Sequence, residues 1–140
     1  MRVLAIDHGE KRIGLAISDP TGTIANPLSV IKHVSRAIDA AQVATLALEH
    51  DAKLIVIGQS FDEDGLPNLA GRRAARFAEA LKEQTDLPVD LWDESFSTQE
   101  ARTARIQMGV SRKKRAGHLD QLAATVILQS YLDAQTQKKE

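Results

Sequence analysis

The chain contains no cysteine, which excludes disulfide bonds and metal sites built on thiolates. Aromatic residues make up only 4% of the sequence, so a stacking platform for single-stranded nucleic acid is not expected. No apolar run approaches the length of a membrane span, and Asp7 interrupts the first run before a signal-peptide core is formed. The 140 residues, 43% of them hydrophobic, suit one globular domain over residues 1–140. We expect this domain to be cytoplasmic.

A strong charge of one sign is also lacking, because the formal net charge is −1. Any attraction to a polyanion must therefore come from local clusters of basic residues. The densest cluster comprises Arg112, Lys113, Lys114 and Arg115. It is interpreted either as a solvated loop or as a clamp for phosphate groups. Lys11 and Arg12 are a second candidate for phosphate contacts, with surface ion pairs as the alternative.

Apolar and amphipathic segments alternate along the chain. Residues 3–6 and 13–17 are too close together for a crossover helix, so they predict an antiparallel hairpin. A third strand at residues 24–31 contains Pro27, which places it at a sheet edge. A helix capped by Ser35 and ending near Asp51 is expected next, followed by a strand at 54–57 and a loop at 58–71. A helix with its apolar face at 74–81 then leads to a strand at 87–92. Two helices are expected after this strand, one from a capping box at 97–100 to Gly109 and the last at 119–134. This order predicts an α/β fold with a mixed five-stranded sheet, antiparallel in its first three strands and parallel in the other two, with helices on both faces.

Two of the predicted strands end on carboxylates. The first strand ends at Asp7, just before Gly9, and the last strand ends at the pair Asp93 and Glu94. Sites in such sheets lie at strand ends, so we expect Asp7 and Glu94 to meet at one edge. The alternative for Asp7 is a turn aspartate that bonds to its own backbone. His8 should alternate to the face opposite Asp7, and we assign it no catalytic role.

A third carboxylate, Asp120, lies at the start of the last helix. Ala123 and Ala124 share or border its face, so this helix should lie close to the sheet and bring Asp120 to the same edge. The alternative is that Asp120 only stabilises the first turn through the helix dipole. Three converging carboxylates form an oxygen-rich site that suits Mg²⁺ or Mn²⁺ and not zinc. Two such ions activate water and stabilise the leaving oxygen in phosphodiester hydrolysis.

Four motifs resemble the YqgF/RuvX family of ribonuclease H-like proteins, namely DHGEKRIGLAISD, WDESFSTQEA, GVSRKKRAG and HLDQLAATVILQSYLD. The resemblance implies a ribonuclease H-like fold. It also implies that Asp7, Glu94 and Asp120 are the catalytic metal ligands, with Asp93 as the alternative to Glu94. Ser95 departs from the family pattern, which usually has arginine after the two acids.

The resemblance also implies a function. The family is described as nucleases that process the 5′ end of pre-16S ribosomal RNA, and as Holliday-junction-resolvase-like. We therefore expect a hydrolase with two Mg²⁺ or Mn²⁺ ions that contacts nucleic acid, either pre-rRNA or branched DNA, through Lys11, Arg12 and the run at residues 112–115. Ribosomal precursor particles are expected partners, and the chain is expected to be a monomer or a homodimer.

Three alternatives remain. The first is a Holliday junction resolvase that acts in recombination, and the second is a nucleic-acid-binding module without catalysis. The third is an actin-like ATPase, which has the same core fold. It is disfavoured because 140 residues leave no room for the second domain that such proteins use to enclose a nucleotide.

Overall fold

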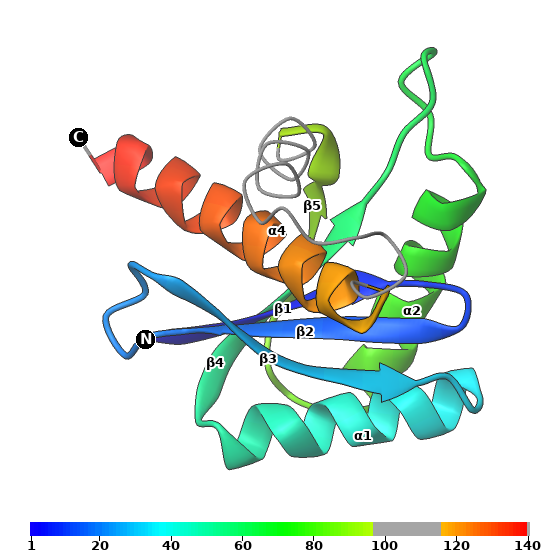
Figure 1. Ribbon diagram of the computed structural model, residues 1–140, viewed down its shortest axis with the longest axis horizontal. Coiled ribbons are helices and arrows are strands. Elements are labelled where there is room, and N and C mark those ends of the chain that lie inside the picture. The colour runs from blue at the N-terminus through cyan, green and yellow to red at the C-terminus, as the bar shows by residue number, and fades with distance from the viewer. Residues whose placement is uncertain (97–115, 140) are drawn as a thin grey trace.

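A computed structural model describes the backbone of residues 1–96 and 116–139, and the side chains of residues 1–95 and 122–136. Figure 1 shows the arrangement of the elements. The strands are β1 (Arg2–His8), β2 (Arg12–Ser18), β3 (Ala25–Lys32), β4 (Ala52–Gln59) and β5 (Val89–Asp93). The helices in the described part are α1 (Arg36–Glu49), α2 (Leu69–Gln84), the 3₁₀ turn η1 (Glu94–Phe96) and α4 (Ala116–Lys139). None of these helices combines the length and the apolar character of a membrane span.

The strands form one sheet in the order β3-β2-β1-β4-β5. The pairs β1–β2 and β2–β3 are antiparallel, whereas β1–β4 and β4–β5 are parallel. This confirms the predicted mixed five-stranded sheet. The three mutually parallel strands end together, because Ile6 pairs with Ile57 and Gly58 pairs with Trp92. The carboxyl ends of β1, β4 and β5 therefore form one continuous edge.

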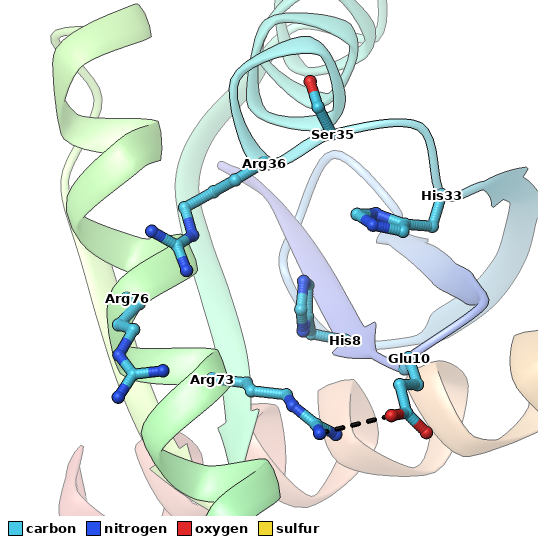
Figure 2. Close-up of a pocket in the computed structure, with 8 residues that line it drawn as sticks. His8, Glu10, His33, Ser35, Arg36, Arg73 and Arg76 are labelled. Atoms are coloured by element: carbon cyan, nitrogen blue, oxygen red, sulfur yellow. Dashed lines mark hydrogen bonds and ion pairs between the residues drawn. The ribbon is translucent and has the colours of Figure 1, made fainter.

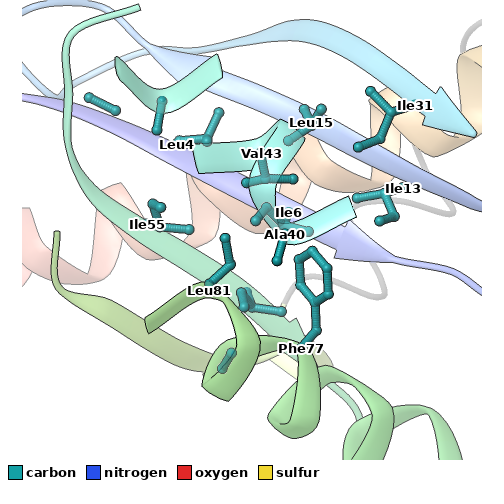
Figure 3. Packing of buried hydrophobic residues seen from close by; sticks show 14 of the residues in the cluster. Leu4, Ile6, Ile13, Leu15, Ile31, Ala40, Val43, Ile55, Phe77 and Leu81 are labelled. Atoms are coloured by element: carbon teal, nitrogen blue, oxygen red, sulfur yellow. The ribbon is translucent and has the colours of Figure 1, made fainter. Parts of the chain in front are cut away.

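Helices cover both faces of the sheet, as predicted, with α1 and α2 on one face and α4 on the other (Figure 1). Alternation along each central strand supplies a core to both sides. Figure 3 shows the larger core, in which Leu4, Ile6 and Ile55 of the sheet pack against Val43 of α1 and Phe77 of α2. The core beneath α4 contains Val3, Ala5, Leu54, Val56, Ala124, Leu128 and Leu132.

The edge position predicted for the proline-containing strand is confirmed, because β3 is the outermost strand. The ladder between β2 and β3 shifts register where Leu15 pairs with Ser29 and Ala16 pairs with Pro27. A proline lacks the backbone N–H that a regular ladder needs, so it is tolerated at such an irregularity on an edge. Ser35 caps α1 as predicted, since its side chain accepts a hydrogen bond from the Ile38 N–H.

Two predicted helix bounds are wrong. The loop at residues 58–71 is shorter than expected, because α2 begins at Leu69 after Asn68, whose side chain accepts a hydrogen bond from the Gly71 N–H at 2.8 Å. Likewise α4 begins at Ala116 and continues to Lys139, beyond the expected 119–134. The apolar pattern marks only the part of a helix that touches the sheet, so polar end turns escape it. The helix expected at 97–109 and the basic run at 112–115 lie outside the described residues.

Candidate active site

Asp7 lies on the α4 face of the sheet, at the edge formed by the strand ends. It follows Ala5 by two residues along β1, and Ala5 is buried in the core beneath α4. Strand alternation therefore directs Asp7 to the same face. The pairing of Ile6 with Ile57 places Asp7 beside Gly58 at the end of β4.

Glu94 reaches the same place from β5. Its backbone begins the 3₁₀ turn η1 immediately after the strand ends. A Cβ atom added to Gly58 would lie 3.2 Å from Glu94 Oε2 and 2.6 Å from Ile127 Cδ1 of α4. Gly58 thus leaves open the space that the Glu94 carboxylate uses. Gly58 lies between the strands that carry Asp7 and Glu94, and the convergence of the two carboxylates stays a prediction.

The structure separates the two neighbouring acids. Trp92 faces α4, because its indole Nε1 donates a hydrogen bond to Ser130 Oγ at 3.2 Å. Asp93 is the next residue along the strand and therefore points away from that face. Its Oδ1 accepts a hydrogen bond from the Ser95 N–H at 2.9 Å, which closes the turn η1. Glu94, and not Asp93, thus faces the space beside Gly58.

The surroundings of Glu94 oppose its negative charge. Burial raises the pKa of this carboxyl group above its ordinary value, a hydrogen bond from Ser60 opposes the rise, and the charge of Asp93 adds to it. A divalent cation bound by the carboxylate would reverse this balance by favouring the ionised form. The donors at this position are carboxylate oxygens, which match the preference of Mg²⁺ and Mn²⁺.

Sequence reasoning missed Ser60 and the role of Gly58. Ser60 Oγ lies 2.6 Å from Asn68 Oδ1 and also interacts with the Glu94 carboxylate, and its single hydroxyl proton serves one of these two acceptors at a time. The loop after β4 is thus placed between the cap of α2 and Glu94. The signal was a glycine that ends a buried apolar strand. Such a glycine often marks a close approach of another group to the backbone.

The remaining predicted residues are placed only in part. Asp120 lies in the first turns of α4, but its side chain is outside the described part of the chain. Among the described side chains, no three acids or histidines converge as a metal-binding cluster. Lys11 lies in the turn between β1 and β2 and Arg12 is the first residue of β2, and both are exposed at the same end of the sheet as Asp7. Arg12 O closes this turn by accepting from the Gly9 N–H at 3.0 Å.

His8 lies on the face opposite Asp7, as predicted. Its ring packs against Phe77 of α2, with ring centroids 4.6 Å apart. Phe77 belongs to the core beneath α1 and α2, so the two neighbouring residues of β1 serve different faces. The prediction that His8 lies away from the acids is therefore confirmed.

Comparisons with known proteins identify relatives of this chain by sequence. The chain is 41% identical over 139 residues to a protein of Syntrophus aciditrophicus named "Putative pre-16S rRNA nuclease", a match that covers 99% of this chain and 93% of the relative. A protein of Thermoanaerobacter pseudethanolicus with the same name is 40% identical over 139 residues, and this match covers 99% of this chain and 100% of the relative.

Solved structures show the same fold at much lower identity. RuvC of T. thermophilus, in complex with a Holliday junction substrate, matches with a TM-score of 0.63 and 16% identity, over 97% of each chain. The Fowlpox virus resolvase in complex with Holliday junction DNA matches with a TM-score of 0.61 and 13% identity, over 96% of this chain and 99% of the other. These likenesses show a RuvC-like ribonuclease H fold. The sequence profile of the RuvX family, described as Holliday junction resolvase, matches residues 1–134, and the chain belongs to this family.

Proposed function

We propose that the chain is a divalent-metal-dependent nuclease that hydrolyses phosphodiester bonds at the 5′ end of pre-16S ribosomal RNA, with residues 1–140 acting as one domain in the cytoplasm. One observation carries the proposal. Asp7 and Glu94 come from separate strands to flank Gly58 at the edge where the parallel strands end. Sites of open α/β sheets lie at this edge.

Asp7 and Glu94 are the proposed metal ligands, and Asp120 of α4 is the proposed third. The ions, two in number, would supply an activated water and neutralise charge at phosphorus when bound. Gly58 keeps the space beside Glu94 open. Ser60 orients the carboxylate through its hydrogen bond, while Asp93 holds the turn that carries Glu94.

Contacts with the substrate are assigned to two groups of basic residues. Lys11 in the turn after β1 and Arg12 at the start of β2 are exposed near Asp7, where they would meet phosphate groups. The run Arg112, Lys113, Lys114 and Arg115 leads into the helix that carries Asp120, and we assign it the same role. A net charge of −1 makes these local contacts the source of attraction to nucleic acid.

The names of the relatives favour RNA as the substrate, whereas the fold is shared with resolvases that bind Holliday junctions. The two substrates are distinguished by one comparison. Cleavage of a pre-16S leader and of a four-way DNA junction is measured at matched salt and Mg²⁺ concentrations, with and without chelator. We expect metal-dependent cleavage of the leader at a defined position. Faster cleavage of the junction would assign the chain to recombination, and cleavage of neither would leave a binding module.

A further inference from the structure

A basic hollow lies on the other face of the sheet, beside the carboxyl end of β1 (Figure 2). Its volume is about 360 Å³, and it opens between the first turn of α1 and the middle of α2. Glu10 is the only acid among the described residues that line it. The basic and imidazole groups around it are His8, His33, Arg36, Arg73 and Arg76.

Two of the three guanidinium groups lack an acidic partner. Arg73 pairs with Glu10 at 3.2 Å, and that carboxylate is 72% exposed. Arg36 and Arg76 are exposed and form no ion pair with any other residue that the structure describes. Cations gathered around a concave surface attract an anion, because each adds to the same local potential. The first turn of α1 adds the positive end of its helix dipole, which the buried Asp39 carboxylate in the same turn, paired with His33, offsets in part.

One of the residues that line the hollow has an unsatisfied polar atom. The Nδ1 atom of His8 is buried, and it has no hydrogen-bond partner within the described part of the chain. Buried polar atoms of this kind are rare in folded proteins, and a bound group beside the ring is one explanation for such an atom. A phosphate oxygen accepts hydrogen bonds from imidazole and guanidinium groups alike.

The hollow is continuous with the proposed substrate contacts. His8 directly follows Asp7, so the two lie at the same end of β1 on opposite faces. The exposed turn that holds Lys11 joins β1 to β2, which begins at Arg12, at this end of the sheet. Its position against the hollow is fixed, because Lys11 O accepts a hydrogen bond from the His33 N–H at 2.9 Å.

We propose that the basic hollow binds a backbone phosphate of the substrate strand at a distance from the scissile bond, with the strand passing around the turn between β1 and β2. This inference rests on the proposed nuclease function. Arg36 and Arg76 would bind the phosphate directly, and Arg73 would exchange Glu10 for it. The hollow therefore contributes to affinity and to the path of the strand, and not to the chemistry.

The test uses two double variants that each remove two positive charges. Arg36→Gln with Arg76→Gln changes the hollow, whereas Lys53→Gln with Lys82→Gln changes exposed lysines elsewhere. Binding of single-stranded pre-16S leader RNA is measured across a salt series, in Ca²⁺ to limit cleavage. We expect the hollow variant to bind more weakly, with a slope of log affinity against log salt that is smaller by about 1.4 for two lost contacts. The lysine variant should keep the slope of the original protein.

Equal slopes for the two double variants would overturn the proposal. Inorganic phosphate and a dinucleoside monophosphate are titrated in parallel while the His8 ring resonances are followed by NMR. A response to inorganic phosphate alone, with equal RNA slopes, would also overturn it, because the hollow would then be a site for free phosphate. If the original protein cleaves RNA but the slopes are equal, only this inference fails. If the slopes differ but no RNA is cleaved, the nuclease function fails and the phosphate site stands.

Discussion

Glu94 combines a partly buried position with a charge that its surroundings disfavour. Burial and the nearby charge of Asp93 both raise the pKa of its carboxyl group, whereas the hydrogen bond from Ser60 lowers this pKa, and burial is the largest of the three effects. The folded protein therefore binds a proton at Glu94 more tightly than the unfolded chain does. Stability consequently falls as the pH rises from the ordinary carboxyl value through the raised value. A bound cation would remove this penalty.

Replacing Glu94 with glutamine should therefore stabilise the metal-free protein. In chelator at neutral pH, we expect Glu94→Gln to unfold at a higher temperature than the original protein. The gain should disappear as the pH falls below the ordinary carboxyl range, because Glu94 is then protonated in both states. Thermal unfolding across a pH series checks this, with the exposed Glu63→Gln as control. A gain that is equal at every pH would contradict the assigned cause.

At the scale of elements, β4 and α4 lie close together at Gly58. A Cβ atom at this position would lie 2.6 Å from Ile127 Cδ1 and 3.4 Å from Ile127 Cγ1. Ile127 is almost completely buried, with 3% of its surface exposed, so its side chain has little freedom to move aside. The glycine therefore sets the distance between the strand end and the helix that carries Asp120.

Gly58→Ala should overpack this contact. We expect a loss of about 1–3 kcal/mol in the free energy of unfolding, together with reduced cleavage because Glu94 and α4 are displaced. Ile127→Val removes the nearest atom, Cδ1, and should recover part of the loss when both changes are combined. Urea unfolding of the two single variants and the double variant measures this coupling. Additive effects would show that the contact between Gly58 and Ile127 does not limit the packing.

Gln129 ties α4 to the hairpin of β2 and β3. Its Oε1 atom accepts from the Ala25 N–H at 2.9 Å, and its Nε2 atom donates to Thr23 O and to Asp133 Oδ1, both at 3.0 Å. The bonds to Ala25 and Thr23 join two segments that are far apart in the sequence, whereas the bond to Asp133 lies within α4. They therefore help to fix the helix against the start of the edge strand.

Gln129→Ala should destabilise the fold by about 1–2 kcal/mol, because the backbone groups of the hairpin lose their partners. Gln42→Ala is the matched control, since Gln42 is exposed on α1. Midpoints of urea unfolding compare the two variants. An equal midpoint for Gln129→Ala and Gln42→Ala would mean that packing alone holds α4 in place.

At the scale of the whole molecule, the sequence predicted the sheet well because its signals are local. The short connection between the first two strands determines the hairpin, and Pro27 determines the edge. Alternation in β1 separates His8 from Asp7. These features depend on neighbours in the sequence, which a pattern of apolar residues records directly.

Other features arise only when distant segments meet. The sequence did not separate Asp93 from Glu94, because the choice depends on where η1 begins and on the space beside Gly58. It also gave no sign of the basic hollow, since Arg36 and Arg76 belong to different helices. The net charge of −1 sums charges over the whole chain and therefore does not reveal that basic residues gather around this hollow.

In the proposed nuclease site, Asp7 and Glu94 hold the ions while Asp93 only supports the turn. Cleavage of a pre-16S leader in Mn²⁺ by Asp7→Asn, Glu94→Gln and Asp93→Asn tests this assignment directly, with circular dichroism to confirm folding. We expect the first two variants to lose more than about 100-fold in rate, since changes to outer-shell partners of a metal already cost about 10- to 100-fold. Asp93→Asn should retain most of its activity, because an asparagine oxygen still accepts the hydrogen bond from the Ser95 N–H. An active Glu94→Gln variant beside an inactive Asp93→Asn variant would contradict the assignment of Glu94 as the metal ligand. Full cleavage by the original protein in excess chelator would contradict the need for a metal ion.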